Sequence, residues 1–141
     1  MDRYMGLDLG TKTIGVALSD PMHMFASAHK TIKRTNIDED IKELIEIIKA
    51  ENVSKIIIGM PYNMNNTVGP SGQRVLSFVD LLKKSVDNEI IYIDERLSTV
   101  SAERVLIETK VRRENRKKHI DKLAATFILQ TYLDRNWGYY G

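Results

Sequence analysis

Two short apolar runs constrain the fold of this chain more than any other feature of its sequence. The first is KIIIG at 55–59, which Gly-Met-Pro closes, and the second is EIIYID at 89–94. Continuous apolar runs of this length are typical of strands that are buried on both faces, as in a parallel sheet covered by helices. Apolar residues between the two runs recur at helical spacing, namely Val75, Phe78, Val79 and Leu82. A strand, a helix and a second strand in this order predict an α/β fold.

The N-terminal part of the chain predicts a meander of three strands followed by a helix. The segments with strand-like patterns are 3–9, 13–19 and 26–32. Asn36 is a suitable N-cap for a helix over 37–51, and Glu39 follows it at the spacing of a capping box. Three antiparallel strands before the apolar runs indicate a mixed sheet rather than a purely parallel one.

The second half of the chain predicts three further helices. They span about 71–85, from Ser98 or Thr99 to about Glu108, and from about Lys118 to Asp134. The basic segment 110–118 is expected to be a loop. The whole order predicts a five-stranded mixed sheet flanked by helices, and ribonuclease H-like folds have this order of elements.

Composition limits the class of protein. With 141 residues, of which 43% are apolar and 28% charged, we expect one domain over 1–141. No apolar run approaches the roughly 18 residues of a membrane span, and the absence of cysteine excludes disulfides, so we expect a cytoplasmic protein without membrane contact. The net charge of +2 decides little, but 110–122 holds seven Lys or Arg residues against two acids. Such a patch suits a polyanion.

Asp8 is the first candidate functional residue, because aspartate is disfavoured in strands and this one stands between two leucines in GLDLG. Gly6 lies on the same face of the strand and is expected to leave open space there. The alternative is an edge-strand aspartate that pairs with Lys12 or Arg3. We favour a functional role, because a strand that ends in an acid can direct it toward a ligand at the edge of the sheet.

Asp94 and Glu95 end the second apolar run and supply the next candidate. Adjacent strand residues point to opposite faces, so only one of them can join Asp8, and alternation alone leaves open which one does. The longer reach of Glu95 favours it, because Arg96 can pair with Asp94. The alternative is a solvent-exposed cluster of acids and bases.

Asp121 lies in the first turn of the last predicted helix, where the helix dipole alone would favour an acid. Ala124 and Ala125 follow it, and small side chains would let this helix lie close to the sheet, with Asp121 near Asp8. Three carboxylates at one point repel each other unless a cation lies between them. Asp8, Glu95 and Asp121 are therefore predicted to be catalytic residues that bind Mg²⁺ or Mn²⁺, with two ions expected, in an enzyme that hydrolyses phosphate esters.

Residues that could hold a nucleic-acid backbone surround these acids in the sequence. The polar loop after 55–59 leads into a helix, and loops after parallel strands commonly bind substrate. The basic segment next to Asp121 could guide phosphates, although such runs are often only solvated loops. The candidate nucleic-acid-binding residues are Lys12, Asn65, Arg74, Arg96, Arg112, Arg113, Arg116, Lys117 and Lys118.

Taken together, GLDLGTKTIGVALSD, GMPYNMNNTVG, DERLSTVSAE and RKKHIDKLAATFILQTYLD resemble the YqgF/RuvX family of Holliday junction resolvases. The resemblance covers about 4–134 and implies a ribonuclease H-like fold similar to RuvC. It also implies a nuclease that processes the 5′ end of pre-16S rRNA or resolves Holliday junctions, with Asp8, Glu95 and Asp121 as the acidic residues. Its partners would be RNA or DNA and ribosome precursor particles, and we expect a monomer or a weak homodimer.

The sequence departs from the resolvase pattern at two positions. Lys118 stands where RuvC-type resolvases have a second aspartate three residues before the last one, so three acids remain instead of four. Asn66 stands where the family often has Gly, and Asn tolerates the same left-handed conformation. Because the metal site would have fewer acidic ligands, a non-catalytic nucleic-acid or ribosome-assembly module is one alternative function. A phosphate-binding fold like that of actin and the heat-shock chaperones is the other.

Overall fold

The computed structural model describes residues 1–96 and 113–136, with side chains described for 1–96 and 123–135. Strands and helices in this part follow the predicted order. The strands are β1 (Arg3–Leu9), β2 (Thr13–Ser19), β3 (Ala26–Lys33), β4 (Val53–Met60) and β5 (Glu89–Asp94). The helices are α1 (Ile37–Ala50), α2 (Pro70–Lys83) and α4 (Arg113–Asn136). Asn36 caps α1 as expected, because its side chain accepts a hydrogen bond of 3.0 Å from the backbone N–H of Glu39.

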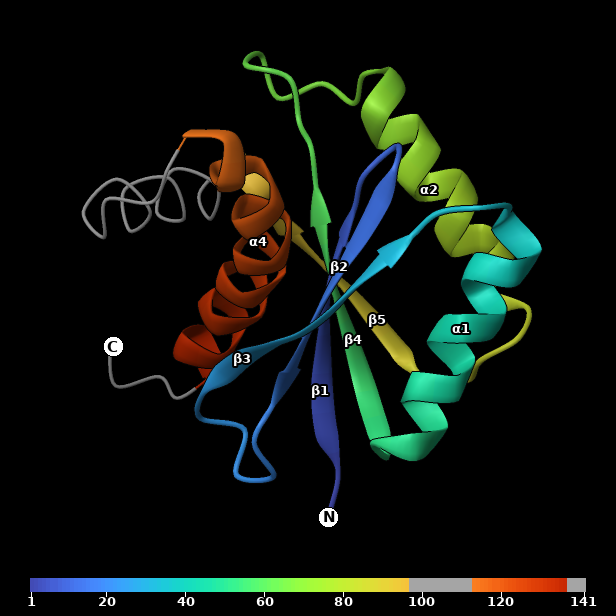
Figure 1. The fold of residues 1–141 in the computed structure, drawn as a ribbon, viewed down its shortest axis with the longest axis vertical. Coiled ribbons are helices and arrows are strands. Elements are labelled where there is room, and N and C mark those ends of the chain that lie inside the picture. Colours follow the sequence, from blue (N-terminus) through green and yellow to red (C-terminus); the bar gives the residue numbers. More distant parts are fainter. Residues whose placement is uncertain (97–112, 137–141) are drawn as a thin grey trace.

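These strands form one mixed sheet in the order β3-β2-β1-β4-β5. β1 pairs antiparallel with β2 and parallel with β4, and β5 continues the sheet parallel to β4. Figure 1 shows α1 and α2 on one face of the sheet and α4 on the other. Each face has its own apolar cluster, so the central strands are covered on both sides. The predicted five-stranded sheet flanked by helices is confirmed.

The last helix begins earlier than expected. The sequence predicted a loop at 110–118, but α4 begins at Arg113. Arg, Lys and Glu are favourable helix residues, and 113–118 contains neither Gly nor Pro to interrupt the backbone hydrogen bonds. The expected loop is therefore wrong for 113–118. The helix expected from Ser98 or Thr99 to about Glu108 lies outside the described residues.

Two glycines let α4 lie against the middle of the sheet. A Cβ atom on Gly6 would lie 2.7 Å from both the carbonyl oxygen of Ala125 and the Cβ of Leu129. A Cβ atom on Gly59 would overlap with Cδ1 of Ile128. The space that Gly6 was expected to leave on its face of β1 is thus filled by α4. The close approach expected from the alanines of this helix is present.

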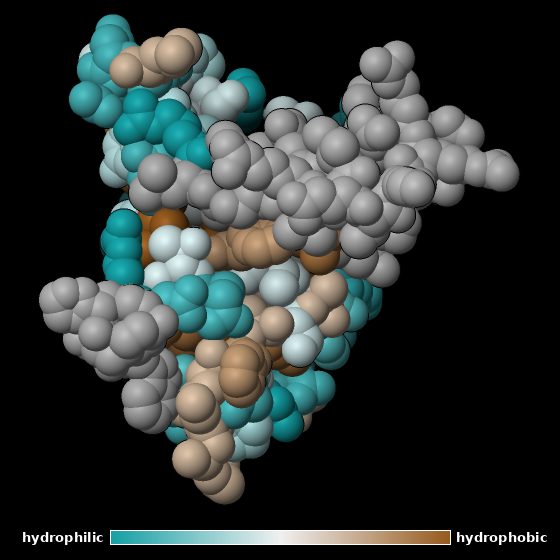
Figure 2. Space-filling view, turned by 90° about the vertical axis from the view of Figure 1, so that its left-hand side faces the viewer, coloured by the Kyte–Doolittle hydropathy of each residue, from teal (hydrophilic) through white to brown (hydrophobic). Residues whose placement is uncertain are grey.

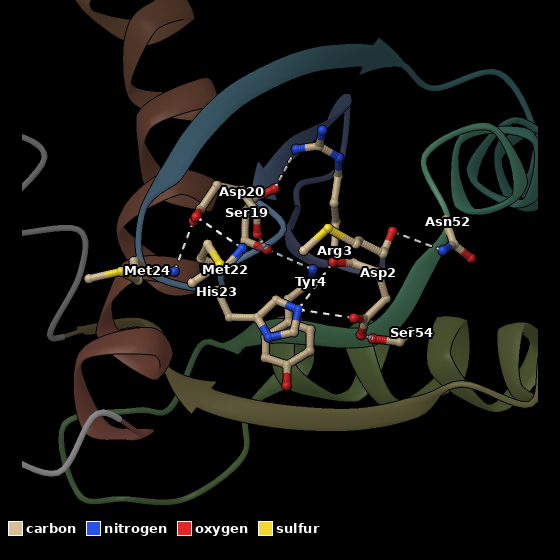
Figure 3. A network of polar contacts seen from close by, with 11 residues as sticks. Asp2, Arg3, Tyr4, Ser19, Asp20, Met22, His23, Met24, Asn52 and Ser54 are labelled. Atoms are coloured by element: carbon tan, nitrogen blue, oxygen red, sulfur yellow. Dashed lines mark hydrogen bonds and ion pairs between the residues drawn. The ribbon is translucent and has the colours of Figure 1, made fainter.

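The amino end of β1 is anchored to the hairpin between β2 and β3 (Figure 3). The backbone N–H of Tyr4 donates to Ser19 Oγ at 2.8 Å, and Arg3 Nη1 donates to the Ser19 carbonyl at 3.0 Å. The ring of His23 stacks on Tyr4 with centroids 3.9 Å apart, and its Nε2 lies 3.3 Å from Asp2 Oδ1. These contacts fix the hairpin at the end of the sheet that lies opposite the carboxyl end of β1.

Exposed apolar side chains gather at this same end of the molecule. The lower part of the space-filling view carries apolar colour (Figure 2), and the hairpin and the N-terminus lie at the lower end of Figure 1. The exposed large apolar residues of these segments are Met1, Met22, Met24 and Phe25.

Among the described residues, no helix has the length and apolar character needed to cross a bilayer.

Replacement of Gly6 by Ala should destabilise the fold, because the added methyl group would collide with the backbone of α4 as well as with Leu129. We expect the free energy of unfolding to fall by about 1–3 kcal/mol, the usual cost of overpacking. Chemical denaturation monitored by circular dichroism measures this change. Ser27→Ala, at an exposed position of β3, is the control and should change the stability little. An unaltered unfolding midpoint for Gly6→Ala would contradict the close packing.

Candidate active site

A pocket of about 300 Å³ lies at the edge of the sheet where the parallel strands end. β1, β4 and β5 run in the same direction, so their carboxyl ends meet at this edge. Ligands collect at the carboxyl ends of strands in open α/β sheets. The residues that line the pocket are Asp8, Leu9, Gly10, Thr11, Arg34, Pro61, Ser71, Arg74, Val75, Phe78 and Glu95.

Two carboxyl groups meet in this pocket. The side chains of Asp8, on β1, and Glu95, directly after β5, are linked by a hydrogen bond. Burial raises the pKa of Glu95, the charge of Asp94 adds to this rise, and the hydrogen bond with Asp8 acts against it. Two carboxyl groups at hydrogen-bond distance cannot both be ionised without a large cost, unless a cation lies beside them.

Asp94 faces a different partner. Arg96 Nη2 lies 2.6 Å from Asp94 Oδ2, and Arg96 Nε donates to Asp94 Oδ1 at 3.0 Å. The hydrogen bonds from Arg96 lower the pKa of Asp94. The structure therefore has the Arg96–Asp94 pair that the sequence favoured, and it brings Glu95 rather than Asp94 to Asp8.

The same arginine holds the loop between β4 and α2. Arg96 Nη1 donates to the carbonyl of Asn63 at 2.9 Å, and Nη2 donates to Asn66 Oδ1 at 2.9 Å. Its guanidinium also lies over the ring of Tyr62, 5.7 Å from the centroid. Asn66 adopts a φ of 66°, so the left-handed conformation that we expected Asn to tolerate here is present. Arg96 thus joins the residue after Glu95 to a loop more than 25 residues earlier in the chain, and its donors are engaged in that task.

Arg34 is a pocket residue that the sequence analysis missed. Its Nε donates to the buried carboxylate of Asp40 at 3.0 Å, and its Nη1 donates to the carbonyl of Gly10 at 2.8 Å. The guanidinium also lies over the Phe78 ring, 5.3 Å from the centroid. These contacts fix a positive charge in the pocket wall. A signal was present in the sequence, because Arg34 stands between a predicted strand and the N-cap of the next helix.

The start of α2 forms another part of the wall. Arg74 lies one turn into this helix and donates from Nη2 to Ser71 Oγ at 3.0 Å. Gly69 is the N-cap and supplies no side-chain hydrogen bond to the first turn. Backbone N–H groups at such a terminus favour an anion. Arg34, Arg74 and this helix terminus give the pocket a positive wall to go with its two carboxyl groups.

The remaining predicted residues lie in three kinds of place. Lys12 is exposed in the β1–β2 turn, next to the pocket residue Thr11. Asn65 is exposed in the β4–α2 loop, where its Oδ1 accepts a hydrogen bond of 2.6 Å from Thr67 Oγ1. The predicted residues whose side chains lie outside the described part are Arg112, Arg113, Arg116, Lys117, Lys118 and Asp121.

The oxygen donors of the pocket suit a hard divalent cation. Asp8 and Glu95 supply carboxylates, which Mg²⁺ and Mn²⁺ prefer, and the described part contains no cysteine or histidine in the pocket lining. A group of three or more potential metal-binding side chains is not found among the described residues, which exclude the side chain of Asp121. The two carboxyl groups therefore fit a magnesium-type ion that takes the rest of its ligands from elsewhere.

Comparison with known proteins agrees with this geometry. A family model described as "RuvX: Holliday junction resolvase" matches residues 2–135. A protein of Clostridioides difficile named "Putative pre-16S rRNA nuclease" is 54% identical over 132 residues, which is 94% of each chain. A relative of the same name from Clostridium tetani is 52% identical over 94% of this chain and 96% of its own.

Solved structures show that the fold is shared more widely. RuvC of T. thermophilus, solved with a Holliday junction substrate, aligns with a TM-score of 0.62 at 11% identity, over 98% of this chain and 97% of that one. The fowlpox virus resolvase, solved with junction DNA, aligns with a TM-score of 0.57 at 13% identity, over 95% and 98% of the two chains. The fold is therefore the ribonuclease H-like fold of RuvC. The resemblance that the sequence motifs indicated is confirmed, and the chain belongs to the RuvX family.

Proposed function

We propose that this protein is a metal-dependent endonuclease that cleaves phosphodiester bonds in precursor 16S rRNA in the cytoplasm. The observation that carries the proposal is the pocket in which Asp8 and Glu95 share a hydrogen bond beside Arg34 and Arg74. Carboxylates can hold a cation and guanidinium groups can hold phosphate, and metal-dependent hydrolysis of phosphodiesters uses both kinds of group. The name of two relatives, in which more than half of the aligned residues are identical to this chain, supports precursor rRNA as the substrate.

Asp8, Glu95 and Asp121 are the proposed ligands of the cation. The packing of α4 supports the third one. Tyr132 packs edge-on against Tyr4, whereas Ala125 lies against Gly6, so α4 runs antiparallel to β1. One further helical turn, about 6 Å, brings the backbone at residue 121 alongside the next two residues of β1, which also span about 6–7 Å. Those two residues of β1 are Leu7 and Asp8.

Bound Mg²⁺ or Mn²⁺, which we propose as a pair of ions, would polarise the scissile phosphate and lower the pKa of an attacking water. The chain's own residues position the substrate. Arg74 and Arg34 lie in the pocket wall, where they can hold non-bridging phosphate oxygens, and the free N–H groups of the first turn of α2 add to this attraction. Arg34 is already oriented by Asp40, so it loses little conformational freedom when a phosphate binds.

Asp8→Asn should abolish cleavage and leave the fold intact, because an amide oxygen is a neutral and weaker ligand. We expect cleavage of a pre-16S rRNA 5′ fragment in Mg²⁺ or Mn²⁺ to fall by roughly a thousandfold, the size of a lost metal contribution of several kcal/mol. Gel assays with radiolabelled RNA measure this, and a four-way DNA junction serves as the second substrate.

The matched control for this substitution is Asp87→Asn, which makes the same exchange at an exposed position before β5, at the opposite edge of the sheet. An equal loss of cleavage in both variants would mean that the loss does not arise in the pocket. Metal-dependent cleavage by Asp8→Asn at the wild-type rate would refute the assignment. RNA binding by the wild type without cleavage in either metal would instead favour the non-catalytic module.

Stability without metal should depend on pH through Glu95. Its pKa in the folded state is raised above the ordinary 4.5, so the folded protein retains this proton at pH values where the unfolded chain has lost it. The free energy of unfolding should therefore fall as pH rises from 4.5 through the raised pKa. Urea denaturation in EDTA across this range should show the fall in the wild type and a smaller fall in Glu95→Gln.

Manganese provides the second arm of this experiment. Ion binding to the native state alone stabilises it, so Mn²⁺ should raise the urea midpoint of the wild type at neutral pH. Glu95→Gln should show a smaller rise. A pH profile identical in the two proteins, or an equal response to Mn²⁺, would count against a charged Glu95 in a cation site.

Arg74→Gln should weaken RNA binding by removing one phosphate contact. We expect the slope of log K against log salt concentration to decrease by about 0.7–0.9, the value for one released counterion. Fluorescence anisotropy in EDTA at several salt concentrations measures the slope. Lys83→Gln, at the other end of α2, changes the net charge equally and should leave the slope nearly unchanged. Similar slopes for both variants would mean that Arg74 makes no direct phosphate contact.

A further inference from the structure

Met64 is more exposed than any other large apolar residue of the described part, with 96% of its surface accessible. It stands in the loop between β4 and α2, at the upper end of the molecule in Figure 1. The upper end of the space-filling view shows a small apolar patch among hydrophilic atoms (Figure 2). Single exposed apolar side chains are common on protein surfaces, so exposure alone carries no functional meaning. The turn that carries Met64 and the link of this turn to the pocket distinguish it from such residues.

The turn that presents Met64 is held by many hydrogen bonds. The backbone N–H of Asn66 donates to the carbonyl of Asn63 at 2.9 Å, which closes a turn over 63–66. The N–H of Asn63 donates to the Thr67 carbonyl at 2.8 Å, and Tyr62 forms a β-bridge with Val68. The backbone on both sides of Met64 is therefore held, and the tip of the turn presents the Met64 side chain to solvent.

The turn is also tied to the pocket. Pro61, three residues before Met64, lines the pocket together with Asp8 and Glu95. Arg96 follows Glu95 directly and bonds both the Asn63 carbonyl and the Asn66 side chain, one on each side of the tip. The position of Met64 relative to the carboxyl pair is thus set by one short loop and one guanidinium.

We propose that Met64 contacts the bases of the substrate and inserts into the base stack beside the scissile phosphate. This inference rests on the proposed nuclease function, because that function places a nucleic-acid strand over the pocket. The base attached to a phosphate held in the pocket extends away from the nucleic-acid backbone, and the loop that carries Met64 begins at the pocket residue Pro61. Methionine is one of the apolar side chains that proteins use as wedges between base steps. A turn that is already ordered presents this side chain without an entropy cost for ordering the loop on binding.

Base unstacking can be measured without cleavage. RNA fragments from the 5′ region of pre-16S rRNA would carry 2-aminopurine at successive positions, because the fluorescence of this base rises when it is unstacked. Each fragment is bound to the Asp8→Asn protein, with and without a second substitution at Met64. We expect increased fluorescence at one step with Met64 present, loss of most of the increase in Met64→Ala, and retention in Met64→Leu, which keeps an apolar side chain of similar volume.

The control for exposed methionine is Met22→Ala. Met22 is 60% exposed in the β2–β3 hairpin, at the other end of the molecule, and Asp20 Oδ2 accepts a hydrogen bond from its backbone N–H. Figure 3 shows it among the contacts that fix that hairpin. Met22→Ala should leave the fluorescence signal as it is. This comparison separates a contact at the pocket from a general effect of removing an exposed apolar group.

Cleavage by proteins with an intact Asp8 gives the second readout. Met64→Ala should lower kcat/KM for the RNA by roughly tenfold, the scale of one lost base contact, and Met64→Leu should restore most of it. Hydrolysis of bis(4-nitrophenyl) phosphate, a phosphodiester without bases, should remain within about twofold of the wild-type rate, since an unchanged pocket keeps its catalysis.

The outcomes separate this inference from the function on which it rests. Unchanged fluorescence and unchanged RNA cleavage in Met64→Ala would overturn the role of Met64 and leave the nuclease proposal standing. Equal losses in Met22→Ala, or the absence of any unstacked position with the parent protein, would also overturn it. If the wild type cleaves neither RNA nor the small diester, the nuclease proposal fails, and the fluorescence series still decides whether Met64 unstacks a base.

Discussion

The contact between Asp8 and Glu95 is the constraint on which the rest of the pocket depends. Two carboxyl groups at hydrogen-bond distance cost free energy near neutral pH, because one of them must keep a proton or a cation must lie beside both. The two arginines nearby form salt bridges with other acids. Arg96 forms its salt bridge with Asp94, and Arg34 forms its salt bridge with Asp40. Arg34 lines the pocket, whereas Arg96 holds the loop that follows the pocket residue Pro61, and the two acids keep these arginines in place.

Close packing of α4 makes the convergence of distant segments possible. Gly59 lies on β4, and a Cβ atom added to it would overlap with Ile128 of α4 and lie 3.5 Å from the Cβ of Glu95. Because Gly59 has no side chain, α4 and Glu95 can both lie close to the carboxyl end of β4. Gly6 does the same for β1. Side chains at these two positions would push α4 away from the sheet.

Much of this architecture could be predicted from the sequence because its signals are local. Alternating and continuous apolar runs fixed all five strands, and Asn36 marked the start of α1. The predicted start of α4 is too late in the chain, because a dense run of charged residues also suits a solvated loop, although Arg and Lys favour helices. Asp8 and Glu95 were chosen from their places at strand ends. Arg34 was missed because its role depends on Asp40 and Gly10, which contact it only after β3 and α1 have packed.

Rigidity of the β4–α2 loop follows from a guanidinium that serves two purposes. Arg96 lowers the pKa of Asp94 and, through Nη1 and Nη2, bonds the turn at Asn63 and Asn66. A lysine could neutralise Asp94 but has no planar fork to reach the turn at the same time. The ordering of this loop is thus achieved during folding instead of during substrate binding, which lowers the entropy cost of binding. Since Arg96 adjoins Glu95, any displacement of the loop is transmitted to the residue next to the carboxyl pair. The loop and the carboxyl groups therefore form one preorganised surface.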